Sequence, residues 1–231
     1  MKIAADFNKR IIEHSANMPW VNSPMPGVAR RPLDRVGDEV ARATSVVRYA
    51  PGSHFKSHVH SGGEEFLVLD GVFQDEHGDY PTGSYVRNPP QSSHTPGSEK
   101  GCVIFVKLWQ FQPEDRTPVR LNINELASAA NPDETGVSVI PLFKDKHEQV
   151  SVIQMKPHTH LKLAPEGGAE LFVIQGSVKE QQDSLIKHSW LRVPIGYSLC
   201  LNTDELGAEI WLKTGHLTDV EQQIQRVLET R

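Results

Sequence analysis

The stretch GSHFKSHVHSGGEEFLVLDG (52–71) decides how this chain is interpreted, because it brings together several groups that bind metals. It contains His58, His60 and Glu64, and a fourth group, His94, follows in PPQSSH (89–94). Imidazole is a good ligand for Zn, Fe, Ni and Cu, and a carboxylate oxygen also suits Mn. The sequence therefore predicts one divalent metal ion held by three histidines and a carboxylate.

The spacing of these four residues fits a site built on β-strands. His58 and His60 are two residues apart, so in a strand both side chains point to the same side. The glycine pair that follows allows a tight reversal of the chain. We therefore expect Glu64 to return toward the two histidines at the start of the next strand, and His94 to join them from a later one.

The composition of the 231 residues excludes several classes of protein. The chain is 38% hydrophobic and 23% charged, with a net charge of -5 and no basic stripe, which argues against direct binding of nucleic acid. No apolar run approaches the roughly 18 residues that a membrane span needs. The two cysteines, Cys102 and Cys200, form no CxxC, and the first residues do not resemble a signal peptide, so we predict a cytoplasmic protein without disulfides.

An internal repeat divides the chain. GGEEFLVLDG (62–71) resembles GGAELFVIQG (167–176), and SYVRNPP (84–90) resembles SWLRVPI (189–195), both at an offset of 105 residues. Such a repeat predicts two domains of similar fold. We place the boundary in the polar stretch 112–118, which gives a metal-binding domain over 1–116 and a second, degenerate domain over 117–231.

Short apolar runs bounded by Gly and Pro predict an all-β fold of sandwich or barrel type. Helix is expected mainly in TDVEQQIQRVLETR (218–231), with Thr218 and Glu221 as a capping box. The predicted apolar face of this helix consists of Val220, Ile224, Val227 and Leu228. A second short helix is predicted in NINELASAA (122–130).

The first unit resembles the cupin superfamily. Its first motif is matched by Gly52, His58, His60, Glu64 and Gly71, and its second by Gly83, Pro89 and His94. The resemblance implies a jelly-roll barrel (a double-stranded β-helix) with a metal inside, and the repeat then implies two tandem cupin barrels followed by a short C-terminal helix. The chain departs from the second motif at Gln91, where Gly is usual, and at Ser98, where Asn is usual.

Beyond the general cupin motif, residues 48–96 and the preceding WVNSPMPGV (20–28) resemble one subgroup, the cupin-like domain of the ChrR-type anti-sigma factors. That family binds zinc through a His-x-His pair, a Glu and a later His, which correspond to His58, His60, Glu64 and His94 here. The same branch includes dioxygenases that cleave diketones and aryl ketones. The His-x-x-x-Cys-x-x-Cys cluster of the sigma-binding domain has no counterpart in this chain, so the resemblance does not extend to sigma-factor binding.

The repeat distinguishes Glu64 from its neighbour Glu65 as the carboxylate ligand. Glu65 is matched by Glu170 in the second unit, whereas Glu64 is matched by Ala169. The other ligand positions are also apolar there, with Leu163, Pro165 and Leu199 in place of His58, His60 and His94. We therefore predict Glu64 as the ligand and Glu65 as structural. A separate His-x-His pair in the second unit, His158 and His160, is interpreted as two polar residues at a strand end.

Two functions rank first as hypotheses, ahead of a third, isomerase or hydrolase chemistry with the metal as a Lewis acid. The first is a metal-binding bicupin related to the ChrR cupin that senses a small molecule or reactive oxygen species and has a regulatory role. The alternative is a metal-dependent dioxygenase that cleaves a small ketone or diketone. We expect zinc, with Fe(II), Mn or Ni as alternatives, a small-molecule ligand in the N-terminal barrel, and a monomer or a homodimer. Further candidates for the barrel mouth are Trp20, Arg48, Tyr49 and Arg87.

Overall fold

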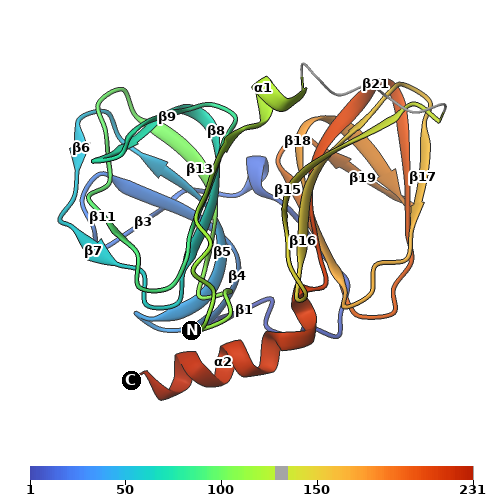
Figure 1. Cartoon of the computed structure of the whole chain (residues 1–231). Helices are drawn as coiled ribbons and strands as arrows, with labels where there is room; N and C mark the ends of the chain where they lie inside the picture. The colour runs from blue at the N-terminus through green and yellow to red at the C-terminus, as the bar shows by residue number, and fades with distance from the viewer. Residues whose placement is uncertain (128–134, 231) are drawn as a thin grey trace. The chain divides into compact units, whose positions relative to one another are not determined.

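The computed structural model describes residues 1–127 and 135–230, and the chain forms two compact units (Figure 1). The first unit combines Met1–Ala5, Pro19–Asn122 and Glu221–Arg231. The second combines Asp6–Met18 and Ile123–Val220. Each unit therefore includes a segment from the opposite half of the sequence. The N-terminal segment Asp6–Met18 belongs to the second unit, and the C-terminal helix belongs to the first.

These units differ from the contiguous ranges 1–116 and 117–231 predicted from the repeat. Strand β2 (Ile11–His14) pairs with β20 (Ser189–Val193) of the second unit. Strand β14 (Val119–Asn122) still pairs with β10 (Ser84–Asn88) of the first. A sequence repeat aligns only the segments that both units share. It therefore cannot predict that a segment at one end of the chain packs in the other unit.

The first unit consists of an 11-stranded sheet and a separate two-stranded sheet, all with antiparallel pairing. The main sheet runs in the order β1-β4-β5-β13-β8-β10-β14, and the small sheet pairs β11 with β7. The remaining strands are β1 (Lys2–Ile3), β3 (Val21–Asn22), β4 (Val28–Gly37), β5 (Ala41–Tyr49), β6 (Ser53–His54), β7 (His58–Val59), β8 (Glu64–Asp75), β9 (Gly78–Pro81), β11 (Ser93–His94), β12 (Gly97–Ser98) and β13 (Cys102–Leu108).

The second unit contains an eight-stranded antiparallel sheet in the order β15-β16-β21-β18-β20-β2, with β17 on β21 and β19 on β18. Its other elements are the 3-10 helices η1 (Ser15–Asn17) and η2 (His216–Asp219), helix α1 (Ile123–Ala127), and strands β15 (Val137–Lys144), β16 (Gln149–Met155), β17 (His160–Leu163), β18 (Ala169–Glu180), β19 (Asp183–Ile186) and β21 (Leu199–Thr214). Helix α1 confirms the first part of the helix predicted over 122–130; residues 128–130 lie outside the described part of the chain.

The repeat seen in the sequence is reproduced in strand lengths and in register. Strands β8 and β18 each have 12 residues, and β10 and β20 each have five. In the first unit His58 pairs with His94, and in the second Leu163 pairs with Leu199 at the corresponding place. The predicted all-β fold with two barrels is therefore confirmed, and so is the replacement of these two histidines by leucines.

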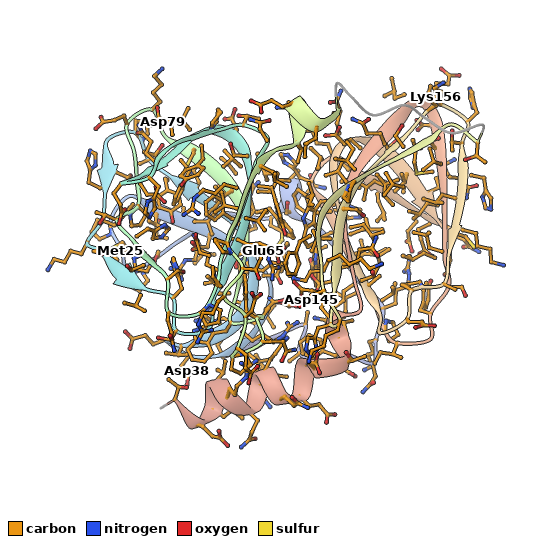
Figure 2. The ribbon with its side chains drawn as sticks, in the orientation of Figure 1. Met25, Asp38, Glu65, Asp79, Asp145 and Lys156 are labelled. Carbon is orange, nitrogen blue, oxygen red and sulfur yellow. The ribbon has the colours of Figure 1, made fainter. Side chains whose placement is uncertain are left out.

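Each unit has an apolar interior, which its side chains fill (Figure 2). The core of the first unit includes Val47, Phe66, Phe73 and Ile104, which are all less than 7% exposed. The larger core cluster of the second includes Leu199, which stands at the position of His94, one of the predicted metal ligands. The second barrel thus has two paired leucines, Leu163 and Leu199, where the first has His58 and His94.

Helix α2 (Val220–Glu229) begins differently from the prediction. The predicted capping box is wrong, because Thr218 lies in η2 and its hydroxyl donates to the carbonyl of Gly215 at 2.9 Å. Val227 is buried as expected, but Leu228 is 41% exposed. The helix was predicted to be short and C-terminal, and this is confirmed.

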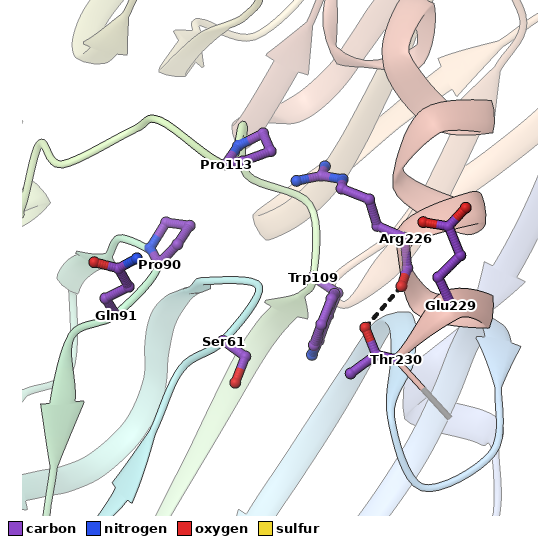
Figure 3. A pocket seen from close by; sticks show the side chains of 8 residues that line it. All are labelled: Ser61, Pro90, Gln91, Trp109, Pro113, Arg226, Glu229 and Thr230. Carbon is purple, nitrogen blue, oxygen red and sulfur yellow. Dashed lines mark hydrogen bonds between the residues drawn. The ribbon is translucent and has the colours of Figure 1, made fainter.

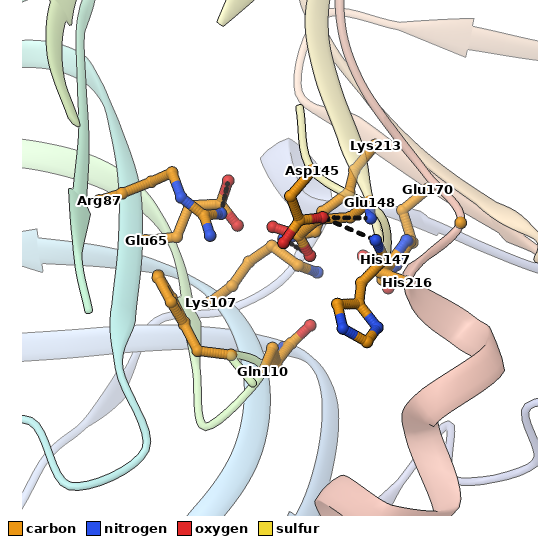
Figure 4. A network of polar contacts seen from close by, with 12 residues as sticks. Glu65, Arg87, Lys107, Gln110, Asp145, His147, Glu148, Glu170, Lys213 and His216 are labelled. Carbon is orange, nitrogen blue, oxygen red and sulfur yellow. Dashed lines mark hydrogen bonds and ion pairs between the residues drawn. The ribbon is translucent and has the colours of Figure 1, made fainter. Parts of the chain in front are cut away.

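Each sheet also carries a buried glutamate at a matching strand position, Glu65 in β8 and Glu170 in β18 (Figure 4). In the first unit Glu65 accepts a hydrogen bond from the hydroxyl of Tyr85 and lies 3.5 Å from Nη1 of Arg87. In the second, Glu170 accepts from Nε1 of Trp190 at 3.1 Å and lies 3.0 Å from Nε2 of His216. Because an unpaired buried charge is strongly destabilising, these partners explain why both copies keep this glutamate.

Candidate metal site

Three histidines of the first unit converge at the small sheet formed by β7 and β11. One side-chain nitrogen from each of His58, His60 and His94 lies within 4.8 Å of the others. The ring centroids are 4.5 to 5.0 Å apart, and the ring planes cross at 74° to 86°. The rings thus surround one common point. His60 and His94 are buried, whereas His58 is exposed and leaves the group accessible from solvent.

The loop that brings His60 to Glu64 depends on its two glycines. Gly63 has φ 78°, a left-handed conformation that favours glycine. A Cβ on Gly62 would lie 2.2 Å from the ring of Trp109, so there is no room for a side chain. The reversal predicted from the glycine pair is therefore confirmed, with close packing as a second reason for it.

Glu64 lies at the start of β8 and faces the histidines. Its Oε2 is 3.4 Å from Nε2 of His60 and 3.6 Å from Nε2 of His94. The same oxygen accepts a hydrogen bond from Nδ2 of Asn88 at 3.3 Å. Glu64 is not within the 4.8 Å grouping of the three imidazoles, but it contacts two of its members. Glu65, the next residue, points to the other side of the strand, toward Tyr85 and Arg87.

The second ring nitrogen of each histidine has a partner away from the common point. Nδ1 of His60 is 3.1 Å from Oγ of Ser92, and Nδ1 of His94 is 3.4 Å from Oδ2 of Asp75. Nδ1 of His58 is 3.4 Å from the carbonyl of Lys56. These contacts orient the rings so that the Nε2 atoms of His60 and His94 lie on the side of Glu64.

Burial tunes the charge state of the group. Desolvation lowers the pKa of His60 to about 3, and the neighbouring His94 and His58 add to the effect. Desolvation also lowers the pKa of His94 to about 4. Burial raises the pKa of Glu64 to about 7, against the opposing effect of its hydrogen bond from Asn88. At neutral pH both buried imidazoles are therefore neutral, which is the form that binds a metal.

The residues present fit a divalent metal ion. Nε2 of His60 is buried and has no hydrogen-bond partner among residues 1–127 and 135–230. A buried polar atom without a partner is costly, and a metal bond would satisfy it. Neutral imidazole nitrogens and one carboxylate oxygen form a donor set that suits Zn, Fe, Mn and Ni. The three-histidine group can thus hold a metal.

The His-x-His pair of the second unit does not form a comparable group. His158 and His160 are both exposed. His158 has φ 56° in the turn before β17, and Nδ1 of His160 is 2.8 Å from Oδ1 of Asn202. Among the described residues the only cluster with metal-ligand geometry is the one in the first unit.

Sequence reasoning missed the residues that orient the ligands. Asn88, Ser92 and Asp75 contact Glu64, His60 and His94, respectively. None of them stands at a fixed motif position in the pattern that identified the ligands. Asn88 and Ser92 flank the proline pair before His94, so their closeness to the ligands was a usable signal. Asp75 is 19 residues before His94 and gave no such signal.

The candidates for the barrel mouth have different surroundings. The guanidinium carbons of Arg31 and Arg48 lie 4.1 and 4.6 Å from the centroid of the Trp20 ring. Tyr49 packs edge-to-face against Phe55 and Phe73. Arg87 is 1% exposed and pairs with Glu65 and Asp115.

A pocket of about 310 Å³ lies beside the loop that carries His60 (Figure 3). It is lined by Ser61, Pro90, Gln91, Trp109, Pro113, Arg226, Glu229 and Thr230. Two of these residues, Gln91 and Trp109, have left-handed backbones with φ 73° and 61°. The backbone N–H of Gln91 donates to the carbonyl of His60, so this pocket borders the site from outside the ring of ligands.

Comparison with known proteins identifies the fold. A family model described as the ChrR cupin-like domain matches residues 8–112. No curated protein matches the sequence significantly. A candidate dioxygenase from Nostoc punctiforme superposes with a TM-score of 0.68 at 15% identity, covering 89% of this chain and 82% of that one.

Two further solved structures are similar. The pirin YhhW of Escherichia coli, in complex with nickel(II), gives a TM-score of 0.63 at 11% identity and covers 89% of this chain and 98% of that one. A variant of salicylate 1,2-dioxygenase from Pseudoaminobacter salicylatoxidans gives 0.56 at 11% identity and covers 79% and 73%. At such identities the likeness shows the fold alone. The chain therefore has a two-barrel cupin fold, and its first repeat resembles the ChrR cupin-like domain.

Proposed function

We propose that the first barrel binds one divalent metal ion through His58, His60, Glu64 and His94, and that the chain is a sensory or regulatory protein. The observation that carries the proposal is the convergence of three imidazoles with the Glu64 carboxylate. One nitrogen of this group, Nε2 of His60, is buried and has no hydrogen-bond partner among the described residues. The match of residues 8–112 to the ChrR cupin-like domain supports a sensing role. The sensed species would be a small molecule or a reactive oxygen species that enters the barrel.

The residues of the chain have separate roles in this proposal. The four ligands hold the metal, which when bound supplies a Lewis-acidic or redox-active centre. Asn88 and Ser92 orient Glu64 and His60 through their hydrogen bonds. The exposure of His58 gives a small molecule a route to the metal from solvent.

A metal-dependent dioxygenase acting on a small ketone or diketone is the second candidate. Exposed His58 favours it, because a catalytic metal must be reached by substrate, and four protein ligands leave up to two positions on an octahedral ion. Two of the structurally similar proteins are described as a candidate dioxygenase and as salicylate 1,2-dioxygenase. On tetrahedral zinc the four ligands leave no position open, which favours sensing.

The metal we expect is zinc, with Fe(II), Mn or Ni as alternatives; the pirin that shares this fold was solved with nickel(II). A small-molecule ligand, a monomer or homodimer, a cytoplasmic location, and the absence of direct nucleic-acid binding stay predictions, and the resemblance gives no support for sigma-factor binding. In the described part of the chain, none of the helices has the length and apolar character needed to span a bilayer.

The proposal is tested by metal analysis of protein purified without added metal, followed by oxygen uptake with diketones. Wild-type protein is expected to contain one metal per chain, and His94→Ala to contain little or none, because one of four ligands is lost. His160→Ala is the matched control and should keep its metal. Full occupancy in His94→Ala would contradict the site, and iron with diketone-dependent oxygen uptake would replace the sensor with the dioxygenase.

The choice of carboxylate has its own test. Glu64→Gln should strongly reduce metal content, because its oxygen is the one that faces the imidazoles. Glu65→Gln should keep the metal but destabilise the barrel, because Arg87 and Tyr85 lose a buried charged partner. The opposite pattern of metal content would reassign the ligand to Glu65.

A further inference from the structure

A polar chain leads from the surface of the first unit to His94. Asp75, the last residue of β8, places Oδ2 3.4 Å from Nδ1 of His94, and its side chain is only 2% exposed. Its other oxygen, Oδ1, accepts hydrogen bonds from the hydroxyl of Tyr80 at 3.2 Å and from the backbone N–H of His77 at 2.8 Å. The Tyr80 hydroxyl in turn accepts from Nε of Arg120 at 3.0 Å.

The neighbouring residues hold the same region from a second direction. Oε2 of Glu76, the residue just after β8, accepts a hydrogen bond from the backbone N–H of Thr95 at 2.7 Å. Asp75 thus contacts the side chain of His94, and Glu76 contacts the backbone that follows it. The ring of Phe73 lies 5.7 Å from that of His94 at an angle of 33°. The imidazole is therefore constrained on one face by an aromatic ring and at Nδ1 by a carboxylate.

The position of Asp75 determines which nitrogen of His94 carries the proton. Nδ1 of His94 lies within hydrogen-bonding distance of Oδ2 of Asp75, at 3.4 Å, whereas Nε2 is 3.6 Å from Oε2 of Glu64, so Nδ1 is the nitrogen placed to donate a hydrogen bond to a carboxylate. Nε2 is then left with its lone pair on the side of Glu64, 3.6 Å away. Metal-bound histidines commonly have such a carboxylate partner, which fixes the tautomer and raises the basicity of the ligand.

We propose that Asp75 is the positioning residue of His94: it selects the tautomer with hydrogen on Nδ1 and orients Nε2 toward the metal, and Tyr80 and Arg120 hold Asp75 in place. This inference deepens the proposed function, since its effect on affinity requires that the first barrel binds a metal. The chain of contacts from Arg120 through Tyr80 and Asp75 to His94 joins elements that are distant in the sequence, because Arg120 lies on β14 and His94 on β11.

The first experiment measures metal affinity by competition with a chromophoric chelator, with Zn(II) as the probe. Asp75→Leu is expected to bind Zn(II) about 10 to 100 times more weakly than wild type, still with one metal per chain. Tyr80→Phe should show a smaller loss. The control is Asp79→Asn, a nearby exposed carboxylate whose hydrogen bond is to Gln74. An affinity for Asp75→Leu within twofold of wild type would overturn the proposal.

The second experiment needs no metal and separates this inference from the proposed function. Long-range ¹H–¹⁵N correlation spectra of the metal-free protein at neutral pH report which nitrogen of each histidine is protonated. We expect hydrogen on Nδ1 of His94 in wild type and a shift toward the other tautomer in Asp75→Leu. Hydrogen on Nε2 in wild type would refute the role of Asp75 even if the protein binds metal. The expected tautomers without metal binding would refute only the metal site.

Discussion

At the scale of single residues, Gln91 shows how this chain accommodates a departure from the cupin pattern. Gln91 stands where the second motif usually has glycine, and its φ of 73° is left-handed, as a glycine position would be. The corresponding residue of the second unit is Gly196, with φ 81°. The backbone shape is therefore retained, and the first unit carries the cost of a side chain in this conformation.

Replacing Gln91 by glycine should stabilise the first unit. A non-glycine residue in the left-handed region costs about 1 kcal/mol, and the greater freedom of glycine in the unfolded chain offsets part of the gain. We expect an increase of up to about 1 kcal/mol in the free energy of unfolding, measured by urea denaturation. Gln91→Ala keeps the Cβ and should stay near wild type; a clear loss of stability in Gln91→Gly would show that the side chain is needed.

The sequence could predict that the three histidines converge, but not which residues orient their rings. The spacing of His58 and His60 and the glycine pair places the ligands on one side of a strand reversal, and the structure brings them together with His94. Glu64 and Glu65 face opposite sides of β8 because side chains alternate along a strand. The contact of Asp75 with His94 depends on the course of β8 over 12 residues, which no local pattern encodes.

At the scale of elements, helix α2 shows where an amphipathic pattern misleads. The pattern placed Leu228 on the buried face, but Leu228 is 41% exposed, whereas the polar Gln223 is 1% exposed. Gln223 accepts a hydrogen bond from Nε of Arg42 at 2.8 Å and donates one to the carbonyl of Gln110 at 3.0 Å. The helix is thus anchored by a buried amide, which hydrophobic periodicity does not detect.

Removing this amide should destabilise the first unit. Gln223→Ala leaves the carbonyl of Gln110 and one N–H of the buried Arg42 without this partner, at a cost of about 2 kcal/mol, since buried groups are left unsatisfied. The free energy of unfolding from urea denaturation checks the loss. Gln222→Ala, on the exposed side of the same helix, should change stability by less than about 0.5 kcal/mol. Equal effects of the two substitutions would mean that the hydrogen bonds of Gln223 contribute nothing.

At the scale of the whole molecule, one fold occurs twice, and among the described residues the three-histidine group occurs only in the first unit. The second unit keeps the lengths of β8 and β10 in β18 and β20, but it pairs two leucines, Leu163 and Leu199, where the first pairs His58 and His94. Its buried Glu170 keeps its structural partners, as Glu65 does. The repeat therefore predicted the number of barrels and the leucines at the positions of His58 and His94, but it carried no signal that the end segments belong to the opposite units.

If only the first unit binds metal, removing the metal should affect the two units unequally. A ligand that binds only the folded state adds about 2.7 kcal/mol of stability when its concentration is 100 times its Kd. Hydrogen exchange with and without a chelator should therefore show faster exchange in β8, β10 and β13 of the metal-free protein, whereas β16, β18 and β21 should be unchanged.

Leu199→Ala, which opens a cavity in the second core, is the complementary perturbation and should accelerate exchange in the second unit while leaving Zn(II) affinity near wild type. Loss of protection in both units on chelation would show that metal binding stabilises the molecule as one cooperative body, and equal protection with and without chelator would leave the metal without a structural role.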